Sequence, residues 1–346
     1  MKVKSSVLLI TIGFLVMLAA CSGGNEAEQS APEPNDQPAE QQGAAEENDE
    51  AATEPLGTMK VGLVCGGMTP LLAQIGINDG SFAAEGLEVE EICFSSGADA
   101  VQALVGGSID ANLGSYEHVL RFADNELDVK TYGQLYNGAS YSLVVKEDAP
   151  FQDISELAGE TIAVTRAGSL SDTALRKGFE GTDIDPDRDV EIIGSGSGAT
   201  MLAAIENNQV AGGMVSEPTV SQMVATGDYR VLYDPDFDYA GIVVMSMADW
   251  VDEHSREMET FLKVMLDIYE RSVEDPASVV EVMQGNFPEV PPDVLQMAIE
   301  AQLSKVPDGL RVTEAGAENV VETAIELGVI EQPVSYEEAV DLSYLP

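Results

Sequence analysis

Cysteine, histidine, tryptophan and basic residues are all scarce in this sequence. Its 346 residues include three cysteines, two histidines and one tryptophan. The histidines, His118 and His254, stand far apart, and no His/Cys/Asp cluster has the spacing of a metal site. The sequence also lacks the G-x-S-x-G and Gly-Lys-Ser/Thr motifs. We therefore expect a protein that is not an enzyme and that carries no cofactor and no metal.

The charge balance is strongly one-sided, with 16 Lys and Arg against 61 Asp and Glu. A surface of this sign repels nucleic acid, so nucleic-acid binding is excluded. Repulsion between so many acidic groups is costly in dilute buffer, but at molar salt the Debye length falls to about 3 Å. The composition therefore predicts an acidic, halophilic protein. An acidic protein from an ordinary habitat is the alternative.

The N-terminus predicts export. Lys2 and Lys4 precede an apolar run of about 14 residues from Val7 to Ala20, which is shorter than the roughly 20 residues of a membrane-spanning helix. This is typical of a signal peptide, here residues 1–20. The run ends in Leu-Ala-Ala-Cys21, which resembles the bacterial lipobox and implies a lipid on Cys21 that anchors the chain to the membrane. A plain secretory signal is the alternative.

Residues 21–56 have the composition of a disordered acidic linker, because they contain no aromatic residue and no apolar periodicity. About 290 residues follow, which is large for a single core. We expect two lobes joined by a hinge. Lobe I is assigned to residues 57–147 and 239–346, and lobe II to residues 148–238.

Short apolar runs alternate with helical patterns through most of these 290 residues, which predicts two α/β lobes, each with a mostly parallel sheet. After Asp249 only helical patterns follow. The expected strands lie at 59–64, 86–92, 109–113, 129–135, 141–145, 161–164, 189–193, 210–215, 229–233 and 240–245. The expected C-terminal helices lie at 257–274, 277–284, 292–303 and 313–327.

Cys65 and Cys93 each close an expected strand. There is no C-x-x-C motif and no ladder of cysteines. A bridge between them is conceivable, but we expect two unpaired, buried cysteines that pack as small apolar residues.

Four segments resemble the nitrate/sulfonate/taurine family of binding proteins of ABC importers, which also includes binders of thiamine-precursor pyrimidines. They are GSFAAEGLEV (80–89), SSGADAVQALVGGSIDA (95–111), DISELAGETIAV (153–164) and AAIENNQVAGG (203–213) followed by SEP (216–218). The resemblance implies the periplasmic-binding-protein type II fold, a clam-shell of two α/β lobes with a hinge and C-terminal helices. The sequence departs from the family pattern at Gly212, where the family usually has an acidic residue. We interpret this departure as a change in a loop.

The resemblance implies a monomeric, extracytoplasmic solute-binding lipoprotein. It would capture a small anion or heterocycle between its lobes and deliver it to an ABC permease and its ATPase. A ligand sensor without a transporter remains an alternative. A thiamine-pyrimidine synthase has a related fold, but its cysteine-rich iron motif and reacting histidine have no counterpart here.

Ligands in open α/β sheets bind beyond the carboxyl ends of the strands, where helix N-termini offer free N–H groups. Five such turns occur here, and each could also be an ordinary turn. Arg166 could grip an anion, Glu217 could accept hydrogen bonds from an amino group, and tyrosines near the strand ends could stack on a flat ligand. The predicted site residues are Gly67, Met68, Thr69, Ser96, Ser115, Tyr116, Arg166, Gly168, Ser169, Ser197, Glu217 and Tyr239.

Overall fold

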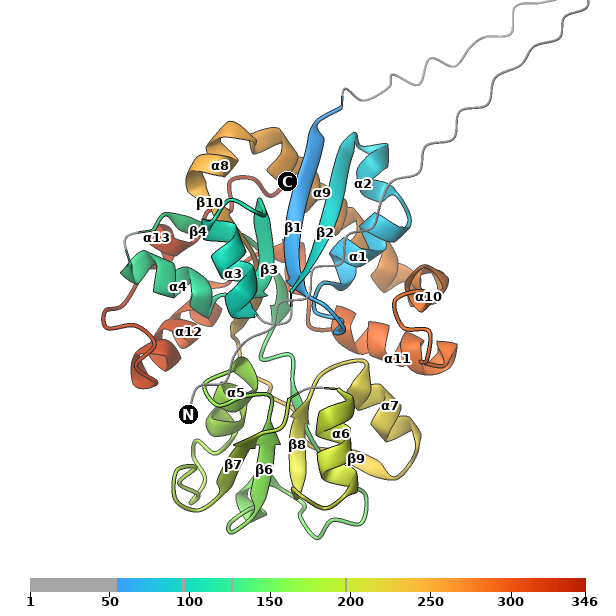
Figure 1. Cartoon of the computed structure of the whole chain (residues 1–346), viewed down its shortest axis with the longest axis vertical. Coiled ribbons are helices and arrows are strands. Elements are labelled where there is room, and N and C mark those ends of the chain that lie inside the picture. The colour runs from blue at the N-terminus through green and yellow to red at the C-terminus, as the bar shows by residue number, and fades with distance from the viewer. Residues whose placement is uncertain (1–54, 95–96, 126, 197) are drawn as a thin grey trace, which may run out of the picture. The chain divides into compact units, whose positions relative to one another are not determined.

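A computed structural model describes residues 55–94, 97–125, 127–196 and 198–346 (Figure 1). The expected signal peptide, the lipidated Cys21 and nearly all of the linker lie outside these residues, as do Ser96 and Ser197. Within the described residues, no helix combines the length and the apolar character needed to cross a membrane. The described residues contain two five-stranded sheets.

The first sheet has the strand order β2-β1-β3-β10-β4. Alternate residues of β1 point into the core, because successive side chains of a strand face opposite sides: Met59, Val61 and Leu63 are buried while Lys60 is exposed. We call this sheet and the helices packed on it lobe I. Its strands are β1 (Gly57–Val64), β2 (Leu87–Phe94), β3 (Ala111–Ser115), β4 (Val129–Asn137) and β10 (Ala240–Met247).

The second sheet has the strand order β7-β6-β8-β5-β9, and with its helices it forms lobe II. It begins at Ser142, whereas the sequence-based division assigned residues up to 147 to lobe I. The chain therefore leaves lobe I over residues 138–141 and returns over residues 234–239. The strands are β5 (Ser142–Lys146), β6 (Thr161–Val164), β7 (Glu191–Gly194), β8 (Gly212–Val215) and β9 (Tyr229–Tyr233).

The expectation of mostly parallel sheets is wrong. In each sheet only two of the four strand pairs are parallel, because one strand enters antiparallel to both of its neighbours. That strand is β10 in lobe I and β5 in lobe II, the first strand after each passage between the lobes. A chain arriving from the other lobe enters the sheet from the opposite end, which reverses its direction.

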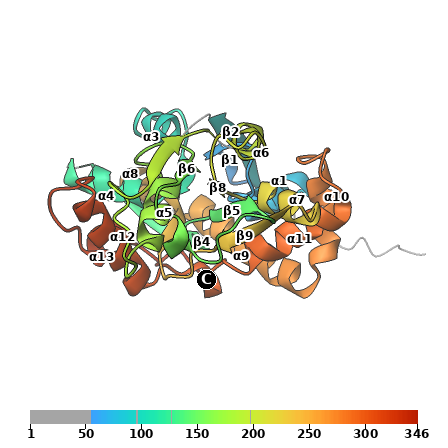
Figure 2. The ribbon, with the colours of Figure 1, turned by 90° about the horizontal axis from the view of Figure 1, so that it is seen from below.

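Helices cover both sheets, and in both views α12 and α13 lie beside α4 (Figures 1 and 2). In lobe I the helices are α1 (Leu71–Asn78), α2 (Ser81–Ala84), α3 (Gly97–Val105) and α4 (Glu117–Asp124). In lobe II they are α5 (Leu170–Gly178), α6 (Ala199–Glu206), α7 (Thr219–Ala225) and the short η1 (Ile154–Glu156). The C-terminal set is α8 (Ala248–Glu253), α9 (Ser255–Glu274), α10 (Pro276–Gln284), α11 (Pro292–Leu303), η2 (Asp308–Leu310), α12 (Glu314–Glu326) and α13 (Tyr336–Ala339).

The long helix α9 packs tightly on α1. Phe261 of α9 stacks on Phe82 of the neighbouring α2, with ring centroids 5.2 Å apart. A Cβ at Gly76 would lie 2.5 Å from the Phe82 ring and 2.8 Å from Ile268, so only glycine permits this approach. The C-terminal helices are therefore part of the lobe I core.

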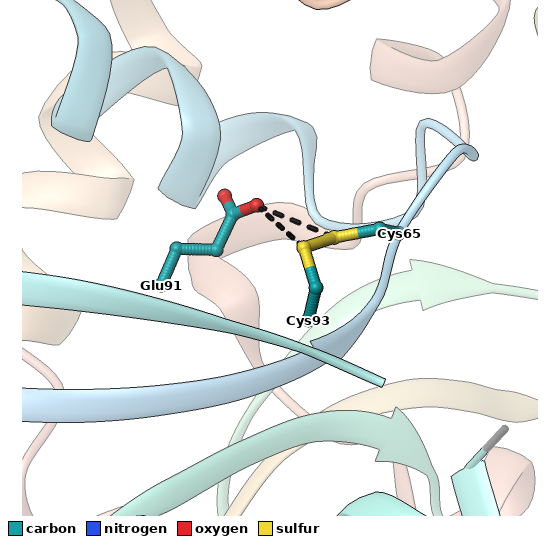
Figure 3. The surroundings of a disulfide bond; sticks show 3 residues. All are labelled: Cys65, Glu91 and Cys93. Carbon is teal, nitrogen blue, oxygen red and sulfur yellow. Dashed lines mark hydrogen bonds between the residues drawn. A yellow bond between two sulfur atoms is a disulfide. The ribbon is translucent and has the colours of Figure 1, made fainter. Parts of the chain in front are cut away.

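Cys65 and Cys93 form a disulfide, with their Cα atoms 5.4 Å apart (Figure 3). The expectation that they are unpaired and buried is wrong. Because β1 and β2 pair in parallel with Leu63 opposite Cys93, the residue that follows β1 lies within reach of the end of β2.

Gly212 is not in a loop, as the sequence suggested, but is the buried first residue of β8. A Cβ there would lie 2.8 Å from Val145 Cγ1 and 2.9 Å from the carbonyl oxygen of Val144. Close packing against β5 therefore accounts for a glycine at this position.

Candidate functional site

The first predicted turn follows β1 and leads into α1. Met68 is buried, and its carbonyl accepts a hydrogen bond from the N–H of Leu71 at 3.0 Å. Gly66 has a positive φ of 93°, and a Cβ at Gly67 would have no neighbour within 4 Å. Thr69 is half-buried. The turn thus presents an uncovered stretch of backbone at Gly67 beside a fixed, buried Met68.

Ser115, the last residue of β3, carries a buried polar atom without a partner among the described residues. Among the described residues, none lies within hydrogen-bonding distance of Ser115 Oγ. A buried hydroxyl of this kind has lost its contacts with water and gained nothing in exchange, which costs free energy unless a ligand or water supplies the bond. The Tyr116 hydroxyl is likewise buried without a partner among the described residues, so both residues have a structural reason to bind a ligand or water.

Tyr116 follows Ser115 but belongs to the interior of lobe I. Its side chain is fully buried in a core cluster with Val119 and Val320, and its N–H donates to the carbonyl of Gly241 at 3.3 Å. Burial raises the pKa of its phenol. Both its backbone donor and its ring are thus taken up by lobe I itself.

Tyr239 lies where the chain re-enters lobe I. Its hydroxyl donates to Glu117 Oε1 at 3.1 Å, and its N–H donates to Asn137 Oδ1 at 3.0 Å. Burial raises the pKa of the Glu117 carboxyl, while the hydrogen bond from Tyr239 opposes that rise. The Tyr239 carbonyl also accepts from the N–H of Gly138 at 2.9 Å, so the two passages between the lobes are joined at Tyr239.

Lobe II concentrates hydroxyl groups at the start of α5. Thr165 Oγ1 lies 2.9 Å from Ser169 Oγ and 2.8 Å from Ser171 Oγ, and the two serine oxygens are 2.8 Å apart. We call these three residues the hydroxyl cluster. Burial raises the pKa of the nearby Tyr141 phenol, and the Thr165 side chain opposes that rise. Ser169 is the N-cap residue of α5, so these groups surround a helix N-terminus, where the dipole favours negative charge.

Gly168 and Asp172 hold the start of α5 in place. Gly168 has a positive φ of 71°, and its N–H donates to Asp172 Oδ2 at 2.7 Å. The other Asp172 oxygen accepts from Arg176 Nε at 2.8 Å. Arg166 is exposed, and within the described part of the chain no carboxylate pairs with it in a salt bridge.

Leu170, the first residue of α5, packs against the core clusters of both lobes. It stands between Ser169 and Ser171, so the hydroxyl cluster lies where lobe II meets lobe I. This contact brings a turn predicted from the sequence to the boundary between the lobes.

Glu217 lies in a second group of polar residues. Its carboxylate accepts from the N–H of Ser221 at 3.1 Å, and the Glu217–Pro218 peptide is cis. Burial raises the pKa of Glu217, and nearby Asp234 adds to the rise. Both carboxylates also act on Tyr136, at the end of β4, and contribute to the raised pKa of its phenol.

A pocket of about 300 Å³ lies between the C-terminal half of α5 and α12. It contains none of the predicted residues. Its lining charges are largely neutralised within the protein, since Arg176 pairs with Asp187 at 2.7 Å and Lys177 with Glu180 at 3.3 Å. The start of α5 is the better candidate, because its hydroxyl cluster adjoins Leu170, which packs on the core clusters of both lobes.

Sequence reasoning missed three residues at these turns. Thr165 and Ser171 complete the hydroxyl cluster, and His118 places Nε2 3.0 Å from the position of a Cβ at Gly97, the first residue of α3. The preference for Ser and Thr near a helix start could have indicated the first two. The position of His118 depends on two turns meeting in space, which no local pattern reports.

The model of the NMT1-like family matches residues 52–284. The chain belongs to the NMT1-like family. No curated protein matches the chain in sequence.

Three solved structures illustrate the fold. The periplasmic aliphatic sulphonate-binding protein SsuA of Escherichia coli is 17% identical, with a TM-score of 0.64 over 82% of this chain and 92% of its own. The periplasmic nitrate-binding protein NrtA of Synechocystis is 16% identical, with a TM-score of 0.63 over 83% of this chain and 86% of its own. A zinc-bound ligand-binding component of an ABC-type import system of Staphylococcus aureus is 15% identical, with a TM-score of 0.65 over 83% of this chain and 97% of its own. The predicted periplasmic-binding-protein fold and the resemblance to sulfonate- and nitrate-binding proteins are thereby confirmed.

Proposed function

We propose that this protein is the extracytoplasmic solute-binding component of an ABC importer. It is anchored by a lipid on Cys21, acts as a monomer and delivers a small ligand to a permease. The family and the fold of the sulphonate- and nitrate-binding relatives support the importer class. The apolar run before Cys21 supports export and anchoring.

The hydroxyl cluster carries the assignment of the site. The N-terminus of α5 provides N–H donors for a ligand rich in oxygen or ring nitrogen, the hydroxyls that bond one another can turn to such a ligand, and Leu170 sets this turn against lobe I. A ligand that touches this turn and Ser115 is bound best when the lobes are closed, so it shifts the population towards the closed form. The permease then recognises that form.

The described turns favour a small anion or a polar heterocycle. Arg166 and the start of α5 suit a sulfonate or nitrate, whereas Tyr136, Tyr141 and Glu217 suit a flat ring such as a pyrimidine. At high salt the negative charge of the protein is screened and does not oppose an anion.

A thermal-shift screen tests the proposal. The full chain carrying Cys21→Ser is heated in about 1–2 M salt with nitrate, taurine, alkanesulfonates, aromatic acids, aminopyrimidines or riboflavin. A ligand at about 100 times its dissociation constant stabilises by about 2.7 kcal/mol and raises the unfolding midpoint by roughly 5 °C.

Ser169→Trp places an indole at the start of α5 and should abolish the shift, while the unfolding midpoint without ligand stays close to that of the parent. Ser155→Trp is the matched control, because Ser155 is an exposed serine of lobe II near a different turn. A ligand that shifts both variants equally would place its binding site away from the hydroxyl cluster.

A further inference from the structure

Three side chains with ligand-forming atoms converge at the ends of β1 and β2. Glu91 and Cys93 are two residues apart on β2 and therefore lie on the same face of the strand, while Cys65 directly follows β1. Glu91 Oε1 lies 3.4 Å from the sulfur of Cys65 and 3.4 Å from that of Cys93 (Figure 3). All three atoms lie within 4.8 Å of one another.

The Glu91 carboxylate has no ion-pair partner among the described residues. In the disulfide form neither sulfur carries a hydrogen, so the carboxylate faces two atoms that cannot donate to it. Two sulfurs and a carboxylate oxygen converge as the ligands of a cation would. In the disulfide form, however, neither sulfur is a thiolate that could bind one.

We propose that reduction converts the Cys65–Cys93 disulfide into a binding site for one soft divalent cation, of which Zn²⁺ is the best fit. Two thiolates and one carboxylate are a donor set that Zn²⁺ accepts, and a water completes four-coordinate geometry. Cations that prefer only oxygen ligands, such as Mg²⁺ and Ca²⁺, bind this donor set poorly. The protein thus alternates between a bridged form without metal and a reduced form that holds metal.

The chemistry balances with a dithiol as the reductant. The dithiol gives two electrons and two protons, becomes a disulfide itself, and the Cys65–Cys93 bond is replaced by two thiols. The cation then displaces both thiol protons to solvent. With Zn–S distances of about 2.3 Å, the sulfurs of a tetrahedral site stand roughly 3.7 Å apart. Rotation of both side chains can open this gap, because the Cα atoms are 5.4 Å apart.

The test uses the full chain carrying Cys21→Ser, so that Cys65 and Cys93 are its only cysteines. The protein is reduced with a dithiol, freed of it without oxygen, and titrated with Co²⁺ and then Zn²⁺. We expect one Co²⁺ per reduced chain, with a thiolate-to-metal charge-transfer band that Zn²⁺ removes. The oxidised chain should bind at least 100-fold more weakly. Equal binding by both forms, or no charge-transfer band, would overturn the proposal.

Variants separate the site from the acidic surface. Glu91→Gln should weaken Zn²⁺ binding about tenfold or more and keep the charge-transfer band, while Glu90→Gln, an exposed neighbour on the other face of β2, should bind like the parent. Cys65→Ser with Cys93→Ser gives the background of surface carboxylates. Circular dichroism checks that the reduced chain stays folded. Unfolding on reduction, or equal affinity in Glu91→Gln and Glu90→Gln, counts against the proposal.

Discussion

His118 lies in the first turn of α4, where its ring faces the first residue of α3. Burial removes water from the imidazole and lowers its pKa to about 4, and the nearby charge of Arg121 adds to this. In the unfolded chain the pKa returns to about 6.5. The folded protein therefore favours the neutral ring, and the unfolded chain takes up a proton more readily.

The free energy of unfolding should consequently fall as pH drops from about 6.5 towards 4, because over this range the unfolded chain binds the extra proton. His118→Gln should flatten this part of the pH profile. Urea unfolding at fixed, high salt, measured at several pH values, tests it. An unaltered slope in His118→Gln would show that other groups cause the acid sensitivity.

Single residues show how far the sequence alone could go. Gly168 and Ser169 were chosen from a strand-to-helix pattern, and the structure places them at the start of α5 beside Leu170, which touches both lobes. Tyr116 came from the same pattern, yet its ring is in the core of lobe I. A local pattern identifies the turn but not the direction of a side chain, because that direction is set by packing with distant segments. The ligand-binding role of every predicted residue stays a prediction.

At the scale of the element, α5 depends on one buried carboxylate. Asp172 accepts from the N–H of Gly168 and from Arg176, so it fixes the first turn and neutralises the guanidinium. Asp172→Asn should lower the free energy of unfolding by about 2 kcal/mol, as expected for hydrogen bonds to a buried charge. Asp187→Asn removes the exposed partner of the same Arg176 and should cost less than about 0.5 kcal/mol. Urea midpoints that are equal for the two variants would contradict this.

Strands and helices were predicted better than their arrangement. The pattern from 292 to 303 predicts α11 to the residue, and all ten expected strands agree within two residues at each end. The antiparallel entry of β5 and β10 escaped prediction, because it follows from the passages between lobes and not from the composition of either strand. The disulfide could not be predicted from the sequence for a similar reason, because only the register of β1 against β2 brings Cys65 close to Cys93.

At the scale of the whole molecule, charge should dominate stability. The formal net charge is −45 at pH 7. Few of these acids are neutralised locally, since the described residues form only seven salt bridges, and most of those have an exposed partner. Like charges lie closer together in the folded chain than in the unfolded chain, so their repulsion acts against the fold. Salt reduces that repulsion over a distance set by the Debye length.

The unfolding midpoint should therefore rise steeply with added KCl and level off near about 1 M, where the Debye length has fallen to about 3 Å. Scanning calorimetry of the Cys21→Ser chain from about 0.05 to 3 M KCl measures this. Sucrose at matched water activity is the control, because it favours burial without screening charge and should give a smaller, gradual rise. A midpoint highest at low ionic strength would mean that repulsion is not limiting and that the acidic surface is no adaptation to salt. A continued rise beyond 1 M that sucrose reproduces would assign the effect to exclusion of solute from the surface.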